Sequence, residues 1–308
     1  MKTFLYIIII SFFSLLNSSW ISYAQYQPLQ FEHLSARQGL PQNWVWSICQ
    51  DKEGLMWFGT YDGLYKYDGH STTSYVLNPA DPAHSLRSNL ISAIHEDRKG
   101  RLWVATWGGG LHQVDKRTGK AIAYPIVAKH ASQWDLHVAM YEDKKGILWL
   151  GTALGLARFD PDSHTFTLYT TPNGKGISQL REDALGRLWS GSYQFDPKTG
   201  KFTLFPLVTA IGNQIFTWLA FDIDAAGMAW LGTEDGLYYM DTRAPDHYTR
   251  YNSKGLLDKS IIRVDATANA DYLWVGTTQG LMQVDKRTNQ ITTYHSDPSQ
   301  PGSLSNNF

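Results

Sequence analysis

"DKEGLMWFGTYDGLYKYD", residues 51–68, combines an acidic turn, a tryptophan, a Gly-Thr step and a Gly-Leu step. The pattern returns five more times along the chain, and each copy carries a tryptophan at the matching place. These tryptophans are Trp57, Trp103, Trp149, Trp189, Trp230 and Trp274, and successive members are 46, 46, 40, 41 and 44 residues apart. Self-similarity at a period of this length indicates a repeat architecture.

Within each repeat, apolar and polar residues alternate mostly with a period of two, which predicts β-strands. In the first repeat we expect strands over 44–51, 55–60, 64–68 and 71–77, joined by turns that contain Asp and Gly. Four antiparallel strands in about 43 residues are typical of one blade of a β-propeller. A lone blade cannot bury both faces of its sheet, so we expect neighbouring blades to stack, with each repeated tryptophan filling the wedge between them. The fold class predicted is therefore all-β, a propeller with six blades and parts of a seventh.

The N-terminus has the features of a secretory signal. Lys2 is followed by an apolar run from Phe4 to Leu16, and Ser22-Tyr23-Ala24 fits a cleavage site. We therefore predict a signal peptide over 1–24 and a periplasmic location; an uncleaved anchor is the alternative.

The remaining chain, 25–308, is predicted to form one propeller domain. Its expected parts are an orphan outer strand of the closing blade (29–35), blade 1 (36–78), blade 2 (79–124), blade 3 (125–170), blade 4 (171–205), blade 5 (206–251), blade 6 (252–294) and the start of blade 7 (295–308). The orphan strand would complete the last blade of a closed ring, because closure removes open sheet edges. A native six-bladed ring is the alternative. The phrase "LWSGSYQFD" predicts a shortened turn between the second and third strands of blade 4, and "DATANADYLW" predicts a longer first hairpin in blade 6.

Composition excludes several classes of function. The net charge of -1 offers no electrostatic case for binding nucleic acid. The single cysteine, Cys49, cannot form an internal disulfide, and no Cys/His cluster points to a metal or other cofactor. One acid recurs in the first turn of five repeats: Asp51, Asp97, Asp143, Asp183 and Asp224. Residues at one position in five blades cannot converge on one site, so we interpret them as Asx-type turn formers.

The pattern D-x-x-G-x-L-W-x-G-T-x-x-G-L-x-x-x-D, preceded by "SLRSNLISAIHED", resembles the two-component regulator propeller repeat. The segment that leads into the first repeat, "GLPQNWVWSICQDKEGLMWFGT", also resembles the first blade of sensors built from this repeat. The resemblance implies the periplasmic sensor part of a hybrid two-component system from a glycan-degrading bacterium. It also implies further propeller and β-sandwich parts, a membrane span and a histidine kinase. We therefore expect an N-terminal, non-enzymatic fragment of a sensor that forms a homodimer and is anchored in the inner membrane by a downstream span.

Recognition is expected on one face of the ring. In a four-stranded blade, the connections between blades share a face with the turns between the second and third strands, and this face varies from repeat to repeat. Five tryptophans outside the repeat positions and the signal map to it or to the adjoining strand starts: Trp44, Trp46, Trp107, Trp134 and Trp218. Near them are polar and aromatic candidates: Asn43, Tyr61, Asp62, Asp135, His137, Glu234, Asp235 and Gln279. Flat rings beside such hydrogen-bonding groups suit sugars, which predicts an oligosaccharide ligand. Alternatively, some rings, notably Trp46 and Trp218, point into the central core, or the patch binds a partner protein.

Two other functions compete with an oligosaccharide sensor. An exported glycosidase or lyase is one, but glycoside hydrolysis uses two carboxylates at a defined separation. The only paired acids on the varied face are Glu234 and Asp235, and consecutive residues need not converge. A non-catalytic interaction scaffold is the other.

Overall fold

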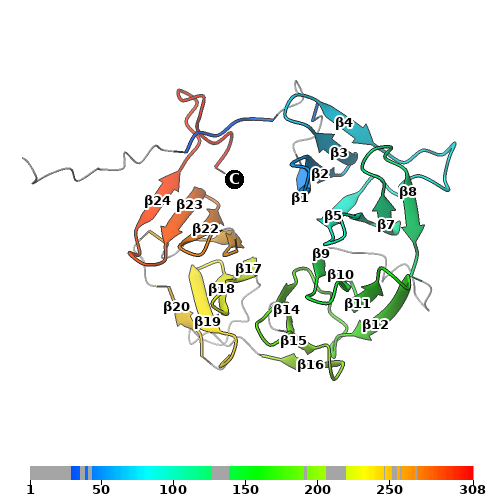
Figure 1. The fold of residues 1–308 in the computed structure, drawn as a ribbon. Coiled ribbons are helices and arrows are strands. Elements are labelled where there is room, and N and C mark those ends of the chain that lie inside the picture. Colours follow the sequence, from blue (N-terminus) through cyan, green and yellow to red (C-terminus); the bar gives the residue numbers. More distant parts are fainter. Residues whose placement is uncertain are drawn as a thin grey trace, which may run out of the picture.

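The computed structural model contains six four-stranded antiparallel sheets arranged in sequence around a ring, which is a β-propeller (Figure 1). The all-β prediction is confirmed. The structure describes residues 29–34, 39–40, 44–126, 139–190, 193–205, 220–245, 247–251, 255–256, 259–267 and 269–307. Within these ranges there is no helix with the length and hydropathy needed to span a membrane.

The strands of each blade follow one another in chain order. Blade 1 comprises β1 (Val45–Gln50), β2 (Met56–Thr60), β3 (Gly63–Tyr67) and β4 (Thr72–Tyr75); blade 2 comprises β5 (Ile91–Glu96), β6 (Leu102–Thr106), β7 (Gly110–Val114) and β8 (Ala121–Tyr124). Blade 3 comprises β9 (Ala139–Glu142), β10 (Leu148–Thr152), β11 (Gly155–Asp160) and β12 (Thr165–Thr170); blade 4 comprises β13 (Arg181–Glu182), β14 (Leu188–Ser190), β15 (Tyr193–Asp196) and β16 (Lys201–Leu204). Blade 5 comprises β17 (Ala220–Ile223), β18 (Met228–Gly232), β19 (Leu237–Asp241) and β20 (Thr249–Arg250); blade 6 comprises β21 (Ile261–Asp265), β22 (Tyr272–Thr277), β23 (Gly280–Asp285) and β24 (Ile291–Tyr294).

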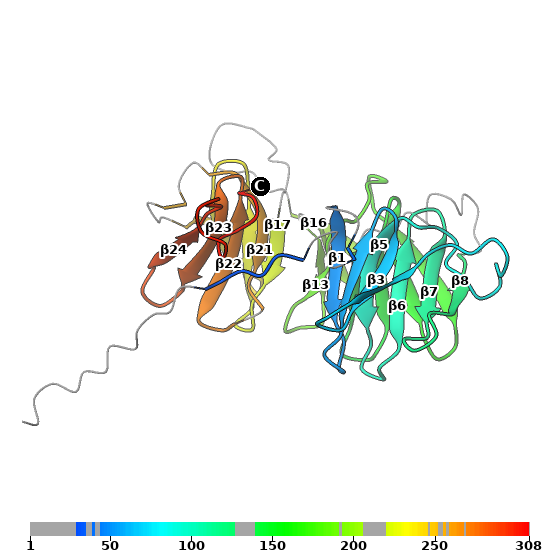
Figure 2. The same cartoon turned by 90° about the horizontal axis from the view of Figure 1, so that it is seen from above.

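We call the four strands of each blade A to D. Strand A is innermost and strand D lies at the outer edge (Figure 1). Because the strands alternate in direction, the A–B and C–D turns lie at one face of the ring, the A–B face. The B–C turns and the connections between blades lie at the other, the B–C face. The strands run between these two faces when the ring is seen edge-on (Figure 2).

Two blades, 4 and 6, were predicted to depart from the repeat pattern in the length of one hairpin turn. The B–C turn of blade 4 is not shortened, because Ser190 pairs with Tyr193 just as Thr60 pairs with Gly63 in blade 1. The strands are shorter instead: β14 has 3 residues and β2 has 5. The prediction for blade 6 is correct, since its A–B hairpin is one residue longer.

A buried Asp–Trp hydrogen bond builds the A–B turn of five blades. In blade 1, Oδ1 of Asp51 accepts the backbone N–H groups of Glu53 (3.0 Å) and Leu55 (2.9 Å), and Oδ2 accepts the indole N–H of Trp57 (2.9 Å). The corresponding indole bonds of blades 2 to 5 measure 2.8 to 3.0 Å. Burial opposes ionisation of Asp51, but these bonds outweigh it and hold its pKa below the usual value. The recurring acids are therefore turn formers.

Each buried tryptophan packs against the next blade. Trp57 lies in one core cluster with Ile91, Leu102 and Val104 of blade 2. Trp103, Trp149, Trp189 and Trp230 pack in the same way against blades 3, 4, 5 and 6. Trp274 is only half-buried. Its blade borders the opening of the ring, where no described sheet covers it (Figure 1).

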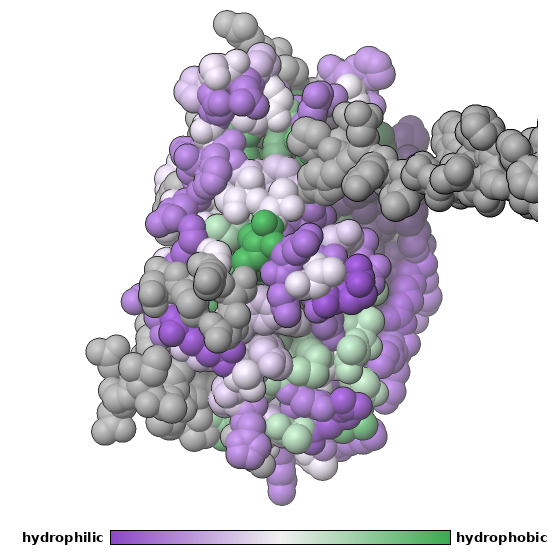
Figure 3. Space-filling model, turned by 90° about the vertical axis from the view of Figure 1, so that its left-hand side faces the viewer, coloured by the Kyte–Doolittle hydropathy of each residue, from purple (hydrophilic) through white to green (hydrophobic). Residues whose placement is uncertain are grey.

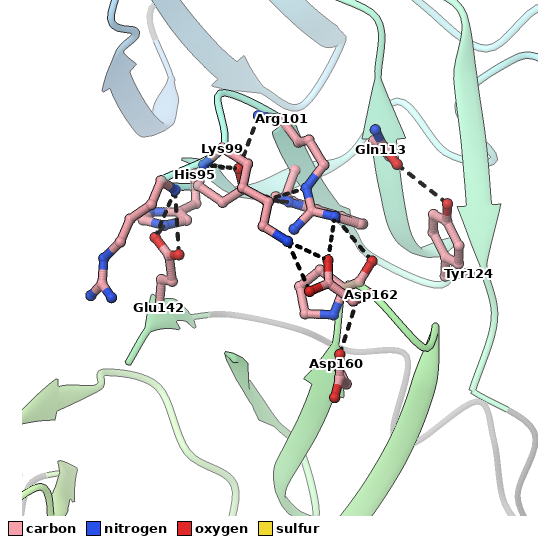
Figure 4. Close-up of polar contacts among 12 residues, drawn as sticks. His95, Lys99, Arg101, Gln113, Tyr124, Glu142, Asp160 and Asp162 are labelled. Atoms are coloured by element: carbon pink, nitrogen blue, oxygen red, sulfur yellow. Dashed lines mark hydrogen bonds and ion pairs between the residues drawn. The ribbon is translucent and has the colours of Figure 1, made fainter. Parts of the chain in front are cut away.

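Polar contacts also join neighbouring blades near the A–B face. At the interface of blades 2 and 3, Glu142 accepts the backbone N–H of Arg98 (3.1 Å) and contacts Nε2 of His95 (3.3 Å), and Lys99 pairs with Asp162 (2.8 Å) (Figure 4). The outer surface of blades 5 and 6 is mostly hydrophilic, and the hydrophobic residues on it are scattered in small spots (Figure 3). Blades are thus held together through their flat faces, and their outer edges face water.

Residues 29–34 cross the opening between blades 6 and 1 (Figure 1). The backbone N–H of Phe31 donates to the carbonyl of Gly302 (2.9 Å), and Nε2 of His33 lies 2.7 Å from the carbonyl oxygen of Ser303. The ring of Phe31 meets that of Tyr294 edge-on at 5.5 Å. The N-terminal segment therefore lies against the residues that follow β24; its completion of a seventh blade stays a prediction.

Removal of one buried turn acid tests the Asp–Trp bond. Asp143→Ala deletes acceptors for the N–H groups of Lys145, Ile147 and the Trp149 indole. It leaves a buried donor unpaired, so we expect the free energy of unfolding to fall by about 3 kcal/mol. Urea unfolding followed by tryptophan fluorescence measures this. The matched control is Asp162→Ala, which removes an exposed carboxylate and should change stability little. Equal stabilities of the two variants would contradict the role given to the turn.

His112 predicts a pH dependence of stability. The side chain is fully buried in blade 2, and its Nε2 accepts the backbone N–H of Arg87 (3.1 Å). Burial, aided by the charge of Arg87, lowers the pKa of His112 from 6.5 to about 4. Between these values the unfolded chain binds the extra proton, so stability falls as pH drops from 6.5 to 4, by about 3 kcal/mol in total. Urea unfolding at several pH values should show this loss, and His112→Gln should reduce it. An unchanged pH profile in the variant would be evidence against this assignment.

Candidate functional site

Four aromatic side chains from blades 1 and 2 gather at the B–C face, and we call them the aromatic rim: Trp44, Trp46, Tyr61 and Trp107. The Tyr61 ring centroid lies 6.4 Å from that of Trp44 and 5.3 Å from that of Trp46, which lies 6.3 Å from that of Trp107. All four remain exposed, by 63%, 50%, 42% and 38% in chain order. So much accessible aromatic surface in one place is typical of a binding surface.

Local backbone structure places each ring. Trp46 occupies an irregularity in the pairing of β1 with β2, where the register shifts between Val45 and Ser47. A bulge of this kind re-aims a side chain out of the regular alternation. Tyr61 lies in the B–C turn of blade 1, where Oγ1 of Thr60 accepts the N–H of Asp62 (3.0 Å). Trp107 begins the B–C turn of blade 2, and its backbone N–H donates to the carbonyl of Leu90 (2.9 Å).

A shallow hollow lies within the rim. It is lined by Trp46, Tyr61, Leu90, Ile91, Ser92 and Trp107. Its walls are almost wholly apolar, and Ser92 among them donates its hydroxyl to the carbonyl of Ala105 (3.1 Å). Such a surface accommodates the C–H face of a ring and leaves polar substituents at the margin.

The centre of the ring is a channel of about 470 Å³. Strand A of each blade, or the residues beside it, contributes to the wall: Val45, Trp46, Ser47, Ile48, Ser92, Ala93, Ile94, Ala139, Met140, Ser178, Gln179, Leu180, Arg181, Phe221 and Arg263. Trp46 and Ser92 line both the hollow and the channel. The two spaces therefore meet at these residues.

The candidates from the sequence are distributed unevenly. The structure brings together Trp44, Trp46, Tyr61 and Trp107, with exposed Asp62 next to Tyr61. Trp46, for which the alternative was an orientation into the central core, lines the channel at the centre of the ring and is half exposed there. Five candidates lie outside the described residues: Asn43, Trp134, Asp135, His137 and Trp218.

The candidates of blades 5 and 6 share the B–C face but not the aromatic rim. Asp235 is used by its own turn, because its carboxylate accepts the hydroxyls of Thr233 (2.6 Å) and Tyr238 (3.0 Å). Glu234 beside it is exposed. In blade 6, the side chain of Gln279 accepts a hydrogen bond from Lys259 (2.7 Å).

Sequence reasoning missed the polar residues of the channel wall. Ser178, Gln179, Arg181 and Arg263 were not among the candidates. The sequence feature that could have identified them is their position in or next to the innermost strand, a few residues before the A–B turn. Among the described residues, no group of three His, Cys, Asp or Glu side chains is placed to hold a metal ion.

Comparison with known families agrees with this architecture. The model of the two-component regulator propeller matches residues 39–62 and 85–108, which cover the start of blades 1 and 2 with the rim residues Trp44, Trp46, Tyr61 and Trp107. The chain carries two-component regulator propeller repeats. The resemblance seen in the sequence is therefore confirmed.

A curated relative that matches the propeller is histidine kinase P4 of Formosa agariphila, 45% identical over 58 residues. The match covers 19% of this chain and 4% of the kinase. Two solved extracellular domains from B. thetaiotaomicron share the fold. The one assigned to the hybrid two-component system BT3049 has a TM-score of 0.75 and 23% identity, over 91% of this chain and 38% of that chain. The one assigned to the one-component system BT4673 has a TM-score of 0.70 and 22% identity, over 89% and 41%. The chain thus spans less than half of each of these relatives.

The fold alone is also shared with an enzyme. Virginiamycin B lyase from Staphylococcus aureus has a TM-score of 0.65 and 15% identity, over 86% of this chain and 87% of the lyase. A propeller scaffold accommodates both sensors and enzymes, so the activity of a given chain depends on its own site residues.

Proposed function

We propose that this chain is an exported sensor module whose aromatic rim binds an oligosaccharide. The exposed cluster of Trp44, Trp46, Tyr61 and Trp107 is the observation that carries the proposal. Sugar rings present C–H faces that pack on aromatic rings and hydroxyls that need polar partners. The exposed Asp62 next to Tyr61 offers such a partner, and Oγ of Ser92 in the lining of the hollow can accept a hydrogen bond.

The junction between blades 1 and 2 suits a site that reports on its ligand. The hollow is formed by residues of both blades, and Trp46 also lines the channel that all six blades share. A ligand that contacts two blades stabilises one arrangement of their interface over others, which is the physical requirement for a signal. The similarity to a histidine kinase and to extracellular sensor domains supports the sensor role. A homodimer of a full-length, membrane-anchored sensor is part of the same proposal.

An enzyme that cleaves glycans is the second candidate, supported by the fold shared with a lyase. The paired acids on the B–C face do not favour it. The carboxylate of Asp235 is engaged by Thr233 and Tyr238, so it is not directed with Glu234 toward a common substrate position. A protein-binding scaffold is the third candidate. Calorimetric titration with oligosaccharides separates it from the sensor, because a scaffold would bind no oligosaccharide.

Calorimetric titration of the mature chain with a panel of oligosaccharides tests the proposal. Trp46→Ala should weaken binding about tenfold, which corresponds to about 1.4 kcal/mol, because a stacking surface is lost. Leu204→Ala is the control, since it removes an equally exposed apolar side chain at the outer edge of blade 4. The proposal fails if the folded wild-type chain binds no member of the panel, or if Trp46→Ala binds as tightly as the control. Release of shortened products would favour the enzyme instead.

A further inference from the structure

The charged side chains in the channel wall are all positive. The polar residues of the wall are Ser47, Ser92, Ser178, Gln179, Arg181 and Arg263, and the described lining contains two arginines and no carboxylate. The rest of the wall is apolar, including Val45, Ile48 and Phe221. Charges of one sign that line a cleft raise the local concentration of ions of the opposite sign.

Arg181 is held in place by a neighbouring blade. Its guanidinium pairs with Asp222 of β17 and donates to the carbonyl of Leu180 (2.8 Å). Asp222 is fully buried behind the wall, and its other oxygen accepts the backbone N–H of Ala266 (2.8 Å) in blade 6. Arg181 thus joins the walls of blades 4 to 6, and its charge is balanced by Asp222.

Arg263 carries the uncompensated charge. It lies in β21 next to an irregularity in the pairing with β22, is exposed, and lines the channel. No described residue forms an ion pair with its guanidinium. None of the glutamates at the other ends of neighbouring strands is an ion-pair partner of Arg263, and their contacts lie near the A–B face. Glu96 pairs with Lys116 (2.8 Å), Glu142 accepts the Arg98 N–H, and Glu182 accepts the hydroxyl of Tyr141 (3.2 Å).

We propose that the channel binds an anionic group of the ligand, so that the oligosaccharide sensed by this chain is an acidic one. This inference rests on the proposed function, because the sugar ring lies on Trp46 while its carboxylate or sulfate reaches Arg263. Trp46 lines both spaces, as Ser92 does, and therefore connects the two contacts. A guanidinium offers two parallel N–H donors, which match the oxygens of either anion. Ser178 and Gln179 add neutral polar groups to the same channel wall.

The test is calorimetric titration of the mature chain with three kinds of oligosaccharide of equal length. Oligogalacturonate carries carboxylates only, a carrageenan oligosaccharide carries sulfates only, and cello- and malto-oligosaccharides are neutral. Arg263→Gln keeps a polar side chain of similar length and removes the charge. Arg117→Gln is the charge-matched control, because Arg117 is exposed in the β7–β8 turn at the A–B face. Circular dichroism and thermal melting establish that each variant folds as the wild type does.

We expect the wild type to bind one or both acidic oligosaccharides more tightly than the neutral ones. Arg263→Gln should weaken acidic binding about tenfold or more and flatten its salt dependence, as loss of a charged hydrogen bond predicts. Neutral binding should not change, and Arg117→Gln should behave as the wild type. Binding of oligogalacturonate alone identifies a uronate, binding of the carrageenan fragment alone identifies a sulfate ester, and binding of both shows that charge decides.

Two results overturn the inference and leave the proposed function intact. One is equal affinity for neutral and acidic oligosaccharides, and the other is unchanged acidic binding in Arg263→Gln. If the folded wild type binds no oligosaccharide of any kind, the proposed function fails together with the inference.

Discussion

The propeller depends on a buried indole whose only polar atom must find a partner inside the blade. A tryptophan is large enough to fill the wedge between two sheets, but its N–H is costly to bury unpaired. Oδ2 of the turn aspartate accepts that N–H, and Oδ1 is held by two backbone N–H groups. The hairpin turn and the packing against the next blade are therefore coupled. Each blade completes its neighbour, and five such interfaces follow in sequence around the ring.

The same constraint determines where recognition is possible. The A–B face is occupied by nearly identical turns and by contacts that join blades, such as that of Glu142 with Arg98. The B–C turns of five blades share a hydrogen bond from a threonine hydroxyl to a glycine carbonyl, but the residues between these two positions differ from blade to blade. The aromatic rim forms there because an irregular pairing in β1 re-aims Trp46 toward the B–C turn residues Tyr61 and Trp107. The channel beside it combines neutral polar residues, such as Ser178 and Gln179, with the charge of Arg263. Packing and binding are thus assigned to opposite faces of one repeat.

The period of the tryptophans was sufficient to predict the fold, because each repeat encodes its own strands and turns. It also placed Trp44, Trp46, Tyr61 and Trp107 correctly on one face, since position within a blade determines the face. Features that depend on contacts between blades or on shifts of register were not predictable. Arg263 was overlooked because an irregular strand breaks the alternation from which its direction would be read. Asp235 was a candidate by position, yet local hydroxyls use its carboxylate. In blade 4 the strands are shorter because the chain between the paired residues Trp189 and Gln194 is shorter than that between Trp57 and Lys66 in blade 1.

Hydrogen exchange of the indole N–H groups, followed by NMR on the chain labelled with ¹⁵N-tryptophan, tests the central claim most directly. The claim is that one class of tryptophan joins the blades while another is free to meet a ligand. It predicts slow exchange for the indoles of Trp57, Trp103, Trp149, Trp189 and Trp230, which are bound to buried aspartates, and fast exchange for the exposed rings of Trp44 and Trp46. Added ligand should shift the signals of the second class and leave the first unchanged. Rapid exchange of the five aspartate-bound indoles in the folded chain would contradict the account.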